Sequence, residues 1–192
     1  MNKHIAIEGM DGVGKSTVCQ LLANRLGYKF IEKPFHYLLN NDINLYRDIT
    51  KKINAIPDPN FTAWYHGLNN LYVDELLKTM NIVTDRFIVS NYCWSGCQEN
   101  EDIYNVLLAK LTKPTLTVIL YAPKDVIKKR LLIRNQNDND LLKLARTDTE
   151  AKYLKMKSFC EIHQLPYLYL DTSNLIPGQI VDVIINHLKY TF

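Results

Sequence analysis

Residues 9 to 16 read Gly-Met-Asp-Gly-Val-Gly-Lys-Ser, which fits the pattern G-x-x-x-x-G-K-[S/T]. Glycines at these places let consecutive backbone N–H groups curl around phosphate oxygens, and a helix after the loop points its positive dipole end there. Lys15 adds a cation, and the Ser16 hydroxyl suits Mg²⁺. We therefore expect a loop that holds ATP and Mg²⁺ for phosphoryl transfer to a small acceptor. The residues expected to contact ATP here are Asp11, Gly12, Val13, Gly14, Lys15, Ser16 and Thr17.

A second chemical segment runs from residue 82 to residue 94, Ile-Val-Thr-Asp-Arg-Phe-Ile-Val-Ser-Asn-Tyr-Cys-Trp. Its apolar start predicts a strand that ends in Asp85 and Arg86, and strand ends carry the sites of parallel sheets. Asp85 is expected to reach Mg²⁺ through water. Arg86 offers a planar fork of donors to an acceptor phosphate. A purely structural Asp–Arg ion pair is the alternative interpretation.

The elements that must position these residues alternate along the chain between short apolar runs and longer helical patterns. Strands are expected over residues 5–8, 28–31, 82–84, 115–121 and 167–170. Helices are expected over residues 16–26, 43–54, 61–79, 95–110, 124–134, 148–164 and 177–189. This alternation predicts an α/β protein with three layers, the P-loop NTPase fold, in which a five-stranded parallel sheet has helices on both faces.

A polar patch, Asn-Gln-Asn-Asp-Asn-Asp at residues 135–140, is too hydrophilic to be buried, and we expect a mobile loop there. It falls within a lid predicted over about residues 134–147. Basic residues around it are Arg130, Arg134, Lys143 and Arg146. We expect Arg130 to contact ATP and Arg134 to neutralise charge on the transferred group, with solvated surface charge as the alternative.

Length and composition restrict the remaining possibilities. With 192 residues and 47% hydrophobic content, residues 1–192 are expected to form one domain. The net charge of +3 lacks a block of like charges, so neither nucleic acid nor a membrane is expected as a partner. The four cysteines lack metal-binding spacing and are expected to be reduced thiols. No apolar run is long enough to span a bilayer, and a cytoplasmic location is expected.

Both chemical segments resemble the thymidylate kinase family, through residues 8–17, Glu-Gly-Met-Asp-Gly-Val-Gly-Lys-Ser-Thr, and residues 85–94. The family has a strand, an E-G-x-D-G-x-G-K-[S/T]-T loop and a D-R-[Y/F]-x-x-S segment that ends in an aromatic residue. The resemblance implies that Asp11 approaches the acceptor 3′-hydroxyl, that Arg86 holds its 5′-phosphate, and that Asn91 lies near the base. Trp94 stands where the family's aromatic residue crowds the sugar 2′ position, which implies a preference for deoxyribose.

Two segments depart from the family pattern. Where the family has R-E-P-G-G, residues 31–36 read Ile-Glu-Lys-Pro-Phe-His, so that Glu32 and Pro34 match, and Glu32 is expected near the acceptor. The loop has Gly12 where some members place an Arg, and members with a small residue there supply basic residues from the lid.

The helix expected over residues 61–79 carries the predicted base contacts. A family helix has a base-stacking Phe and, four residues later, an Arg; Tyr65 and Asn69 stand at these places. One face, formed by Trp64, Leu68 and Leu71, is expected in the core. The other, formed by Tyr65, Asn69 and Tyr72, is expected either in the pocket or in packing.

The resemblance implies a nucleoside monophosphate kinase that uses ATP and Mg²⁺, with dTMP as acceptor. A monophosphate is already mostly an oxyanion at neutral pH, so no general base is needed. The alternative is a deoxynucleoside kinase, whose 5′-hydroxyl acceptor needs a carboxylate, and Glu32 is the candidate. A regulator that binds nucleotide without turnover is a third possibility. A GTPase is disfavoured because no N-K-x-D segment is present. The resemblance also implies a possible homodimer.

Overall fold

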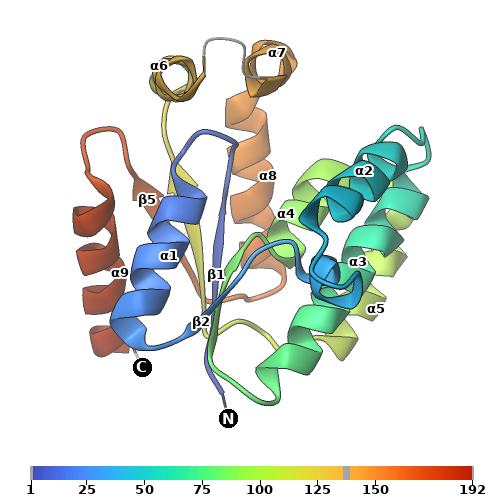
Figure 1. Cartoon of the computed structure of the whole chain (residues 1–192), viewed down its shortest axis with the longest axis horizontal. Coiled ribbons are helices and arrows are strands. Elements are labelled where there is room, and N and C mark those ends of the chain that lie inside the picture. The colour runs from blue at the N-terminus through green and yellow to red at the C-terminus, as the bar shows by residue number, and fades with distance from the viewer. Residues whose placement is uncertain (1, 136–138, 192) are drawn as a thin grey trace.

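The computed structural model describes residues 2–135 and 139–191 of the chain. Its centre is a five-stranded parallel sheet with the order β2-β3-β1-β4-β5 (Figure 1). The strands are β1 His4–Gly9, β2 Lys29–Ile31, β3 Ile82–Asp85, β4 Leu116–Tyr121 and β5 Tyr167–Asp171. The α-helices are α1 Lys15–Leu26, α2 Ile43–Asn54, α3 Pro59–Leu77, α4 Ile88–Ser95, α5 Glu101–Lys110, α6 Lys124–Arg134, α7 Asn139–Arg146, α8 Thr149–Ile162 and α9 Pro177–Thr191. Two 3₁₀ turns, η1 Pro34–Leu38 and η2 Gln98–Asn100, complete the described elements.

The helices form the outer layers. Helices α1 and α9 pack together on one face of the sheet, and α3, α4, α5 and α8 cover the other, while α6 and α7 lie at the top of the view (Figure 1). Every residue of β1 is buried, as expected for a central strand covered on both sides. The predicted fold class, a three-layer α/β P-loop fold with five parallel strands, is confirmed.

Register brings the chemical segments to one edge of the sheet. Ile7 of β1 pairs with Asp85 of β3, and Gly9 pairs with Leu120 of β4. The loop after β1 and the residues after β3 therefore emerge side by side at the carboxyl ends of the strands, where ligands bind in open α/β sheets.

The helix boundaries follow local chemistry. Asp58 accepts a hydrogen bond from the N–H of Asn60 at the start of α3, and Pro59 occupies the first turn, so α3 begins before the expected residue 61. Helix α1 ends at Gly27, whose left-handed backbone allows its N–H to bond the carbonyl of Ala23.

The prediction of one continuous helix over residues 95–110 was wrong, although residues 101–110 are helical and form α5. The chain forms α4, then η2, then α5, and α4 lies in the segment that the sequence analysis left without a helix. Six of the eight residues of α4 are buried, so the segment lacks the one-sided apolar pattern that identifies a surface helix.

Two further expectations are corrected. The prediction of a mobile loop was wrong for residues 139 and 140, which begin α7. Residues 136–138 of that prediction lie outside the described residues. The prediction of which face of α3 lies in the core was also wrong, since Trp64 is 43% and Leu68 is 51% exposed. The buried face passes instead through Gly67, where an added Cβ would lie 2.9 Å from Leu107 of α5.

Among the described residues, no helix combines the length and the apolar character needed to span a bilayer.

Candidate active site

The loop between β1 and α1 is shaped for a phosphate. Gly14 occupies the N-cap of α1 with a φ of 99°, and no side chain caps the helix there. The amides of the first turn are therefore left without a side-chain acceptor and can serve an anion. Gly12 has a φ of 85°, and a Cβ on it would lie 2.8 Å from the side chain of Leu131 on α6. This close packing explains why a larger residue does not stand at Gly12.

The ammonium of Lys15 is a buried cation at this loop. Its side chain is 7% exposed, its ammonium donates to the Met10 carbonyl at 3.0 Å, and it lies 3.8 Å from the Asp11 carboxylate. Burial lowers the pKa of Lys15, and the Arg86 charge acts in the same direction. An anion bound on the loop would raise the pKa of Lys15 again, because its negative charge would lie beside the ammonium.

Ser16 and Asp85 form the pair expected to hold Mg²⁺. The Ser16 hydroxyl donates to Asp85 Oδ2 at 2.6 Å. The other carboxylate oxygen, Oδ1, is buried and has no hydrogen-bond partner among the described residues. A hydroxyl and a carboxylate with an unused oxygen fit Mg²⁺, which commonly takes one or two protein ligands and completes its shell with water and substrate phosphates.

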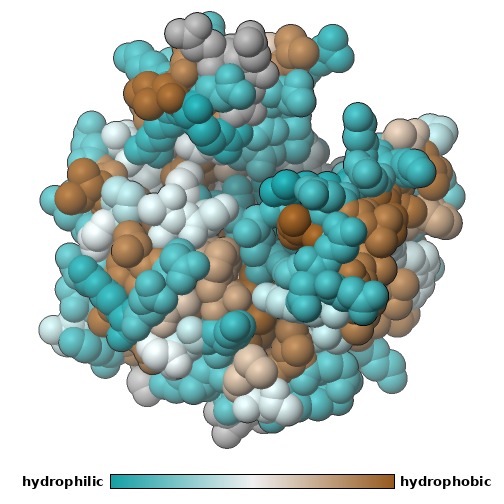
Figure 2. All heavy atoms as spheres, viewed as in Figure 1, coloured by the Kyte–Doolittle hydropathy of each residue, from teal (hydrophilic) through white to brown (hydrophobic). Residues whose placement is uncertain are grey.

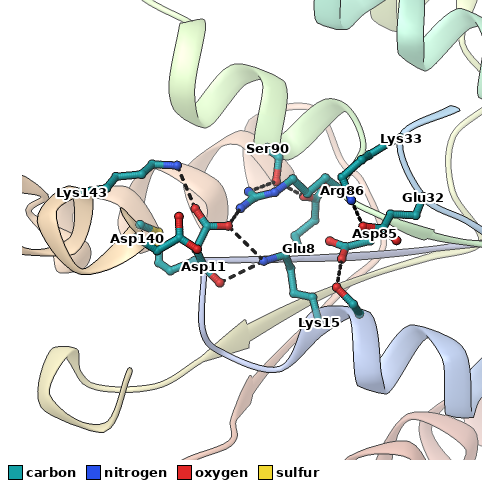
Figure 3. Close-up of polar contacts among 12 residues, drawn as sticks. Glu8, Asp11, Lys15, Glu32, Lys33, Asp85, Arg86, Ser90, Asp140 and Lys143 are labelled. Carbon is teal, nitrogen blue, oxygen red and sulfur yellow. Dashed lines mark hydrogen bonds and ion pairs between the residues drawn. The ribbon is translucent and has the colours of Figure 1, made fainter. Parts of the chain in front are cut away.

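A charged cluster joins the loop, the strand β3 and the helix α7 (Figure 3). Asp11 forms ion pairs with Arg86 and with Lys143, the latter at 2.8 Å. Burial opposes ionisation of Asp11, but the charges of Arg86, Lys15 and Lys143 hold its pKa well below the usual range. Asp11 is therefore an anion that orients three cations at the mouth of the site.

Arg86 has an unusual backbone. Its φ of 73° lies in the left-handed region, which residues with a side chain rarely adopt and which clusters at functional sites. The guanidinium also donates to the Ser90 hydroxyl at 3.2 Å. Behind it lies Glu8, fully buried, a residue of the family motif to which the sequence analysis assigned no role.

A cavity of 640 Å³ opens next to this cluster. Figure 2 shows a hollow between the α6–α7 end of the molecule and the α2 side, with many hydrophilic side chains around it. Asp11, Asn69, Arg86, Asn91 and Trp94 line the cavity, so the structure brings these predicted residues together. Lining residues that the sequence analysis did not select include Lys33, Tyr46, Thr62, His66, Asn70 and Ser90. A helical spacing from Thr62 through His66 to Asn69 and Asn70 was the signal that could have found three of them.

Two predicted acceptor residues lie elsewhere. Tyr65 is not among the described residues that line the cavity; its hydroxyl shares a hydrogen bond of 2.7 Å with Thr50, and its ring packs edge-on against Phe35. Glu32 is also absent from this lining and forms an ion pair with Lys33.

Trp94 lines the cavity, and two lysines lie over its ring. The Lys143 ammonium lies 4.1 Å from its ring centroid and the Lys152 ammonium 4.8 Å, both within cation–π range. Lys143 thus connects α7 to both Asp11 and Trp94.

The lid arginines make other contacts. Arg130 donates to the carbonyl of Val13 at 3.3 Å and to the hydroxyl and carbonyl of Thr172. Arg134 donates to Asp140 at 2.7 Å, and Arg146 is exposed. Among the basic residues predicted for the lid, Lys143 is the one that lines the cavity.

An enzyme that transfers a phosphoryl group between two anionic ligands can hold the donor on such a loop and the acceptor in a neighbouring cavity, with cations between them. Lys15 and Arg86 stand at that boundary, and this is the arrangement of a P-loop kinase. The family model described as AAA domain matches residues 5–155, and the chain belongs to this family.

Several named relatives of this chain are kinases. The chain is 27% identical to a protein named "Probable thymidylate kinase" from Methanococcus maripaludis, over 97% of this chain and 94% of the relative. It is 26% identical to the thymidylate kinase of Helicobacter pylori, over 84% of this chain and 88% of the relative. The predicted resemblance to thymidylate kinases and the predicted enzyme class, a nucleoside monophosphate kinase, are confirmed.

Solved structures show the same fold. The thymidylate kinase of Ehrlichia chaffeensis superposes with a TM-score of 0.66 at 15% identity, covering 98% of each chain. A deoxyadenosine kinase from M. mycoides, solved with dCMP and dCDP, superposes with a TM-score of 0.64 at 17% identity, covering 97% of this chain and 99% of that one.

Proposed function

We propose that this kinase transfers the γ-phosphoryl group of ATP to the 5′-phosphate of a deoxynucleoside monophosphate, with dTMP as the preferred acceptor. The observation that carries the proposal is the guanidinium of Arg86, which lines the acceptor cavity beside the phosphate loop. A planar fork of donors at this point suits an acceptor that brings its own phosphate. The names of the curated relatives support dTMP as the particular acceptor.

The carboxylates of the site favour a monophosphate over a nucleoside. A 5′-hydroxyl acceptor needs a carboxylate within hydrogen-bond reach, but Glu32 pairs with Lys33 and lies off the described cavity wall. Asp11 and Asp85 do line the cavity, yet Asp11 is paired with cations and Asp85 is proposed to hold Mg²⁺ together with Ser16. A phosphate acceptor requires no such base, because it is already ionised near neutral pH.

In this proposal the chain's own groups act by position and charge. Backbone amides from Gly12 to Thr17 and the Lys15 ammonium hold the ATP phosphates, while Arg86 holds the acceptor phosphate. Mg²⁺ on Ser16 and Asp85 would neutralise charge on the phosphates. Arg130 supports the loop through the Val13 carbonyl.

The acceptor end is proposed to read the sugar and the base. Asp11 is proposed to accept from the 3′-hydroxyl, and Trp94 to close the space beside the sugar. Asn69 and Asn91 line the cavity and are proposed to contact the base, after exchanging the bonds that their amides now donate to the carbonyls of Tyr65 and Ala63. Tyr65 contributes by packing, since its hydroxyl bonds Thr50.

The lid proposed over residues 134–147 closes when both substrates are bound. Arg134 would then exchange Asp140 for the transferred group.

The single domain, the possible homodimer and the cytoplasmic location stay predictions.

A panel of acceptors tests the proposal. We expect ADP release with ATP·Mg²⁺ to be fastest with dTMP, slower with dUMP and dCMP, and slowest with UMP. Equal turnover of all four monophosphates would contradict recognition of base and sugar, and no turnover with any acceptor despite ATP binding would support the regulator.

Replacing Trp94 with alanine is expected to weaken discrimination against ribose. Removing the indole opens the space beside the 2′ position, so the ratio of kcat/KM for dUMP over UMP should fall about tenfold. Trp94→Phe keeps a ring and should retain most of the ratio. An unchanged ratio in the alanine variant would show that another residue excludes the 2′-hydroxyl.

Replacing Asp85 with asparagine is expected to raise the Mg²⁺ concentration needed for half-maximal activity and to lower kcat by about 100-fold. The amide loses the negative charge but keeps one oxygen toward Ser16. Mg²⁺ titrations of ADP release check this, with EDTA expected to abolish activity in both proteins. A variant with the wild-type Mg²⁺ requirement would remove Asp85 from the metal site.

A further inference from the structure

Glu8 is a buried acid that the proposed reaction does not use. It is the last residue but one of the central strand β1, is 0% exposed, and is not among the described residues that line the cavity. A carboxylate in such a place is costly unless hydrogen bonds compensate it. Here Oε1 accepts from the backbone N–H of Phe87 at 3.0 Å, and Oε2 accepts from the hydroxyl of Ser90.

The contact with Phe87 places Glu8 at the start of α4. Phe87 is the N-cap of that helix, and its side chain makes no cap hydrogen bond. No acidic residue stands in the first turn of α4 either. Glu8 therefore supplies, from another element, the acceptor and the negative charge that helix N-termini favour.

The same contact fixes the backbone of Arg86. The left-handed φ of Arg86 is held on one side by its own N–H, which donates to the Ile7 carbonyl at 2.9 Å. It is held on the other side by the Phe87 N–H on Glu8. Two adjacent amides are thus tied to β1, and the Arg86 side chain leaves the strand toward Asp11 and the loop (Figure 3).

Ser90 connects the acid to the guanidinium. Its hydroxyl donates to Glu8 and accepts from Arg86 Nη1 at 3.2 Å, while Nη2 of the same guanidinium donates to Asp11. Arg86 and Glu8 attract each other, and the serine oxygen stands between them. Without that hydroxyl, the guanidinium is free to turn toward Glu8 and away from the acceptor cavity.

We propose that Glu8 and Ser90 are positioning residues, a buried relay that sets the direction of the Arg86 guanidinium and so the affinity for the acceptor phosphate. This inference rests on the proposed function, in which Arg86 holds that phosphate. A purely structural role for Glu8, as the cap of α4, predicts something different. Ser90→Ala leaves the cap on Phe87 intact, so a cap alone would give this variant a normal acceptor KM.

The variants are Glu8→Gln, Ser90→Ala and Ser90→Thr. Glutamine keeps an oxygen for the Phe87 N–H, but its amide nitrogen cannot accept from Ser90. Threonine restores the hydroxyl. Thr84→Val is the matched control, because it removes another buried hydrogen bond, the 2.9 Å contact between His4 and Thr84, outside the relay.

The experiment is run at pH 8. Burial raises the pKa of Glu8 to about 7, against the lowering effects of the Ser90 hydrogen bond and the Arg86 charge, so the carboxylate is ionised there. The other titratable groups that face Glu8 are the thiols of Cys19, Cys93 and Cys160 from α1, α4 and α8. Burial raises the pKa of each thiol, so all three are neutral at this pH.

Two measurements decide the inference. In ADP-release kinetics we expect Glu8→Gln and Ser90→Ala to raise the KM for dTMP about tenfold, as for loss of one hydrogen bond to a charged group, with the KM for ATP unchanged. Ser90→Thr and Thr84→Val should keep the wild-type KM. In nucleotide-free NMR spectra, the Arg86 Nε–H resonance, assigned by its absence in Arg86→Lys, should shift in Ser90→Ala and Glu8→Gln and return in Ser90→Thr.

The kinetic and NMR measurements distinguish a failure of the proposed function from a failure of the relay. If the wild type phosphorylates thymidine but not dTMP, the proposed function fails, and the Arg86 resonance still decides whether the relay orients the guanidinium. An unshifted resonance in Ser90→Ala, or a KM for dTMP equal to that of the wild type, overturns the relay.

Discussion

Arg86→Ala should lower kcat/KM for dTMP by about 1,000-fold, because the variant loses two charge-assisted contacts to the acceptor phosphate. It also removes one of the cations that pair with Asp11, so the Asp11 carboxylate would repel the incoming anion more strongly. The KM for ATP should change little, since the loop and Lys15 hold ATP. Initial rates of ADP release at varied dTMP and at varied ATP check both statements.

The effect of the positive charge of Arg86 on acceptor binding can be separated from the effect of its planar guanidinium donors. Arg86→Lys keeps the cation but cannot reach Ser90 and Asp11 together, so it should recover about tenfold over alanine and no more. Arg25→Ala is the matched control, because its ion pair with Asp182 joins α1 to α9 outside the described cavity wall. If Arg86→Ala raised the KM for ATP and left that for dTMP unchanged, Arg86 would serve the donor.

Lys15→Met should lower kcat by about 1,000-fold or more, since the loop loses the buried cation that is proposed to hold the ATP phosphates. Methionine has a similar length and suits the buried position, where Lys15 is 7% exposed, so the fold should persist. ADP release at saturating dTMP measures the loss, and thermal unfolding checks the fold. Lys29→Met, at an exposed position on β2, is the control. Activity within tenfold of the wild type would contradict the role of Lys15.

The parts of the site that follow directly from strand ends were predictable. The loop segment 9–17 and the pair Asp85 and Arg86 each begin at the last residue of a buried strand, and β1 and β3 are neighbours in register. Parallel pairing alone then brings the loop, the carboxylate and the guanidinium together. Gly12, Lys15 and Ser16 accordingly occupy the places that the motif requires.

Contacts made by distant helices were not predictable. Lys143 reaches Asp11 from a position 132 residues further along the chain, and its place over Trp94 depends on how α7 packs. No local pattern encodes that geometry. Ser90 lies in a recognised motif, but its link to Glu8 depends on α4, a helix buried on nearly all sides.

The face of α3 was misjudged for a related reason. Apolar side chains recur at Trp64 and Leu68, yet both are exposed, and the small Gly67 faces α5 instead. Periodicity identifies a helix and its stripes, but close packing of two helices is decided by small residues that hydropathy overlooks.

The most direct test of the central claim compares dTMP with thymidine as acceptor, each with ATP·Mg²⁺, by ADP release and by identification of the product. We predict formation of dTDP from dTMP and no phosphorylation of thymidine, because Arg86 is proposed to bind the phosphate of the acceptor. Formation of dTMP from thymidine, with dTMP itself inert, would contradict it and would assign the reaction to a carboxylate base.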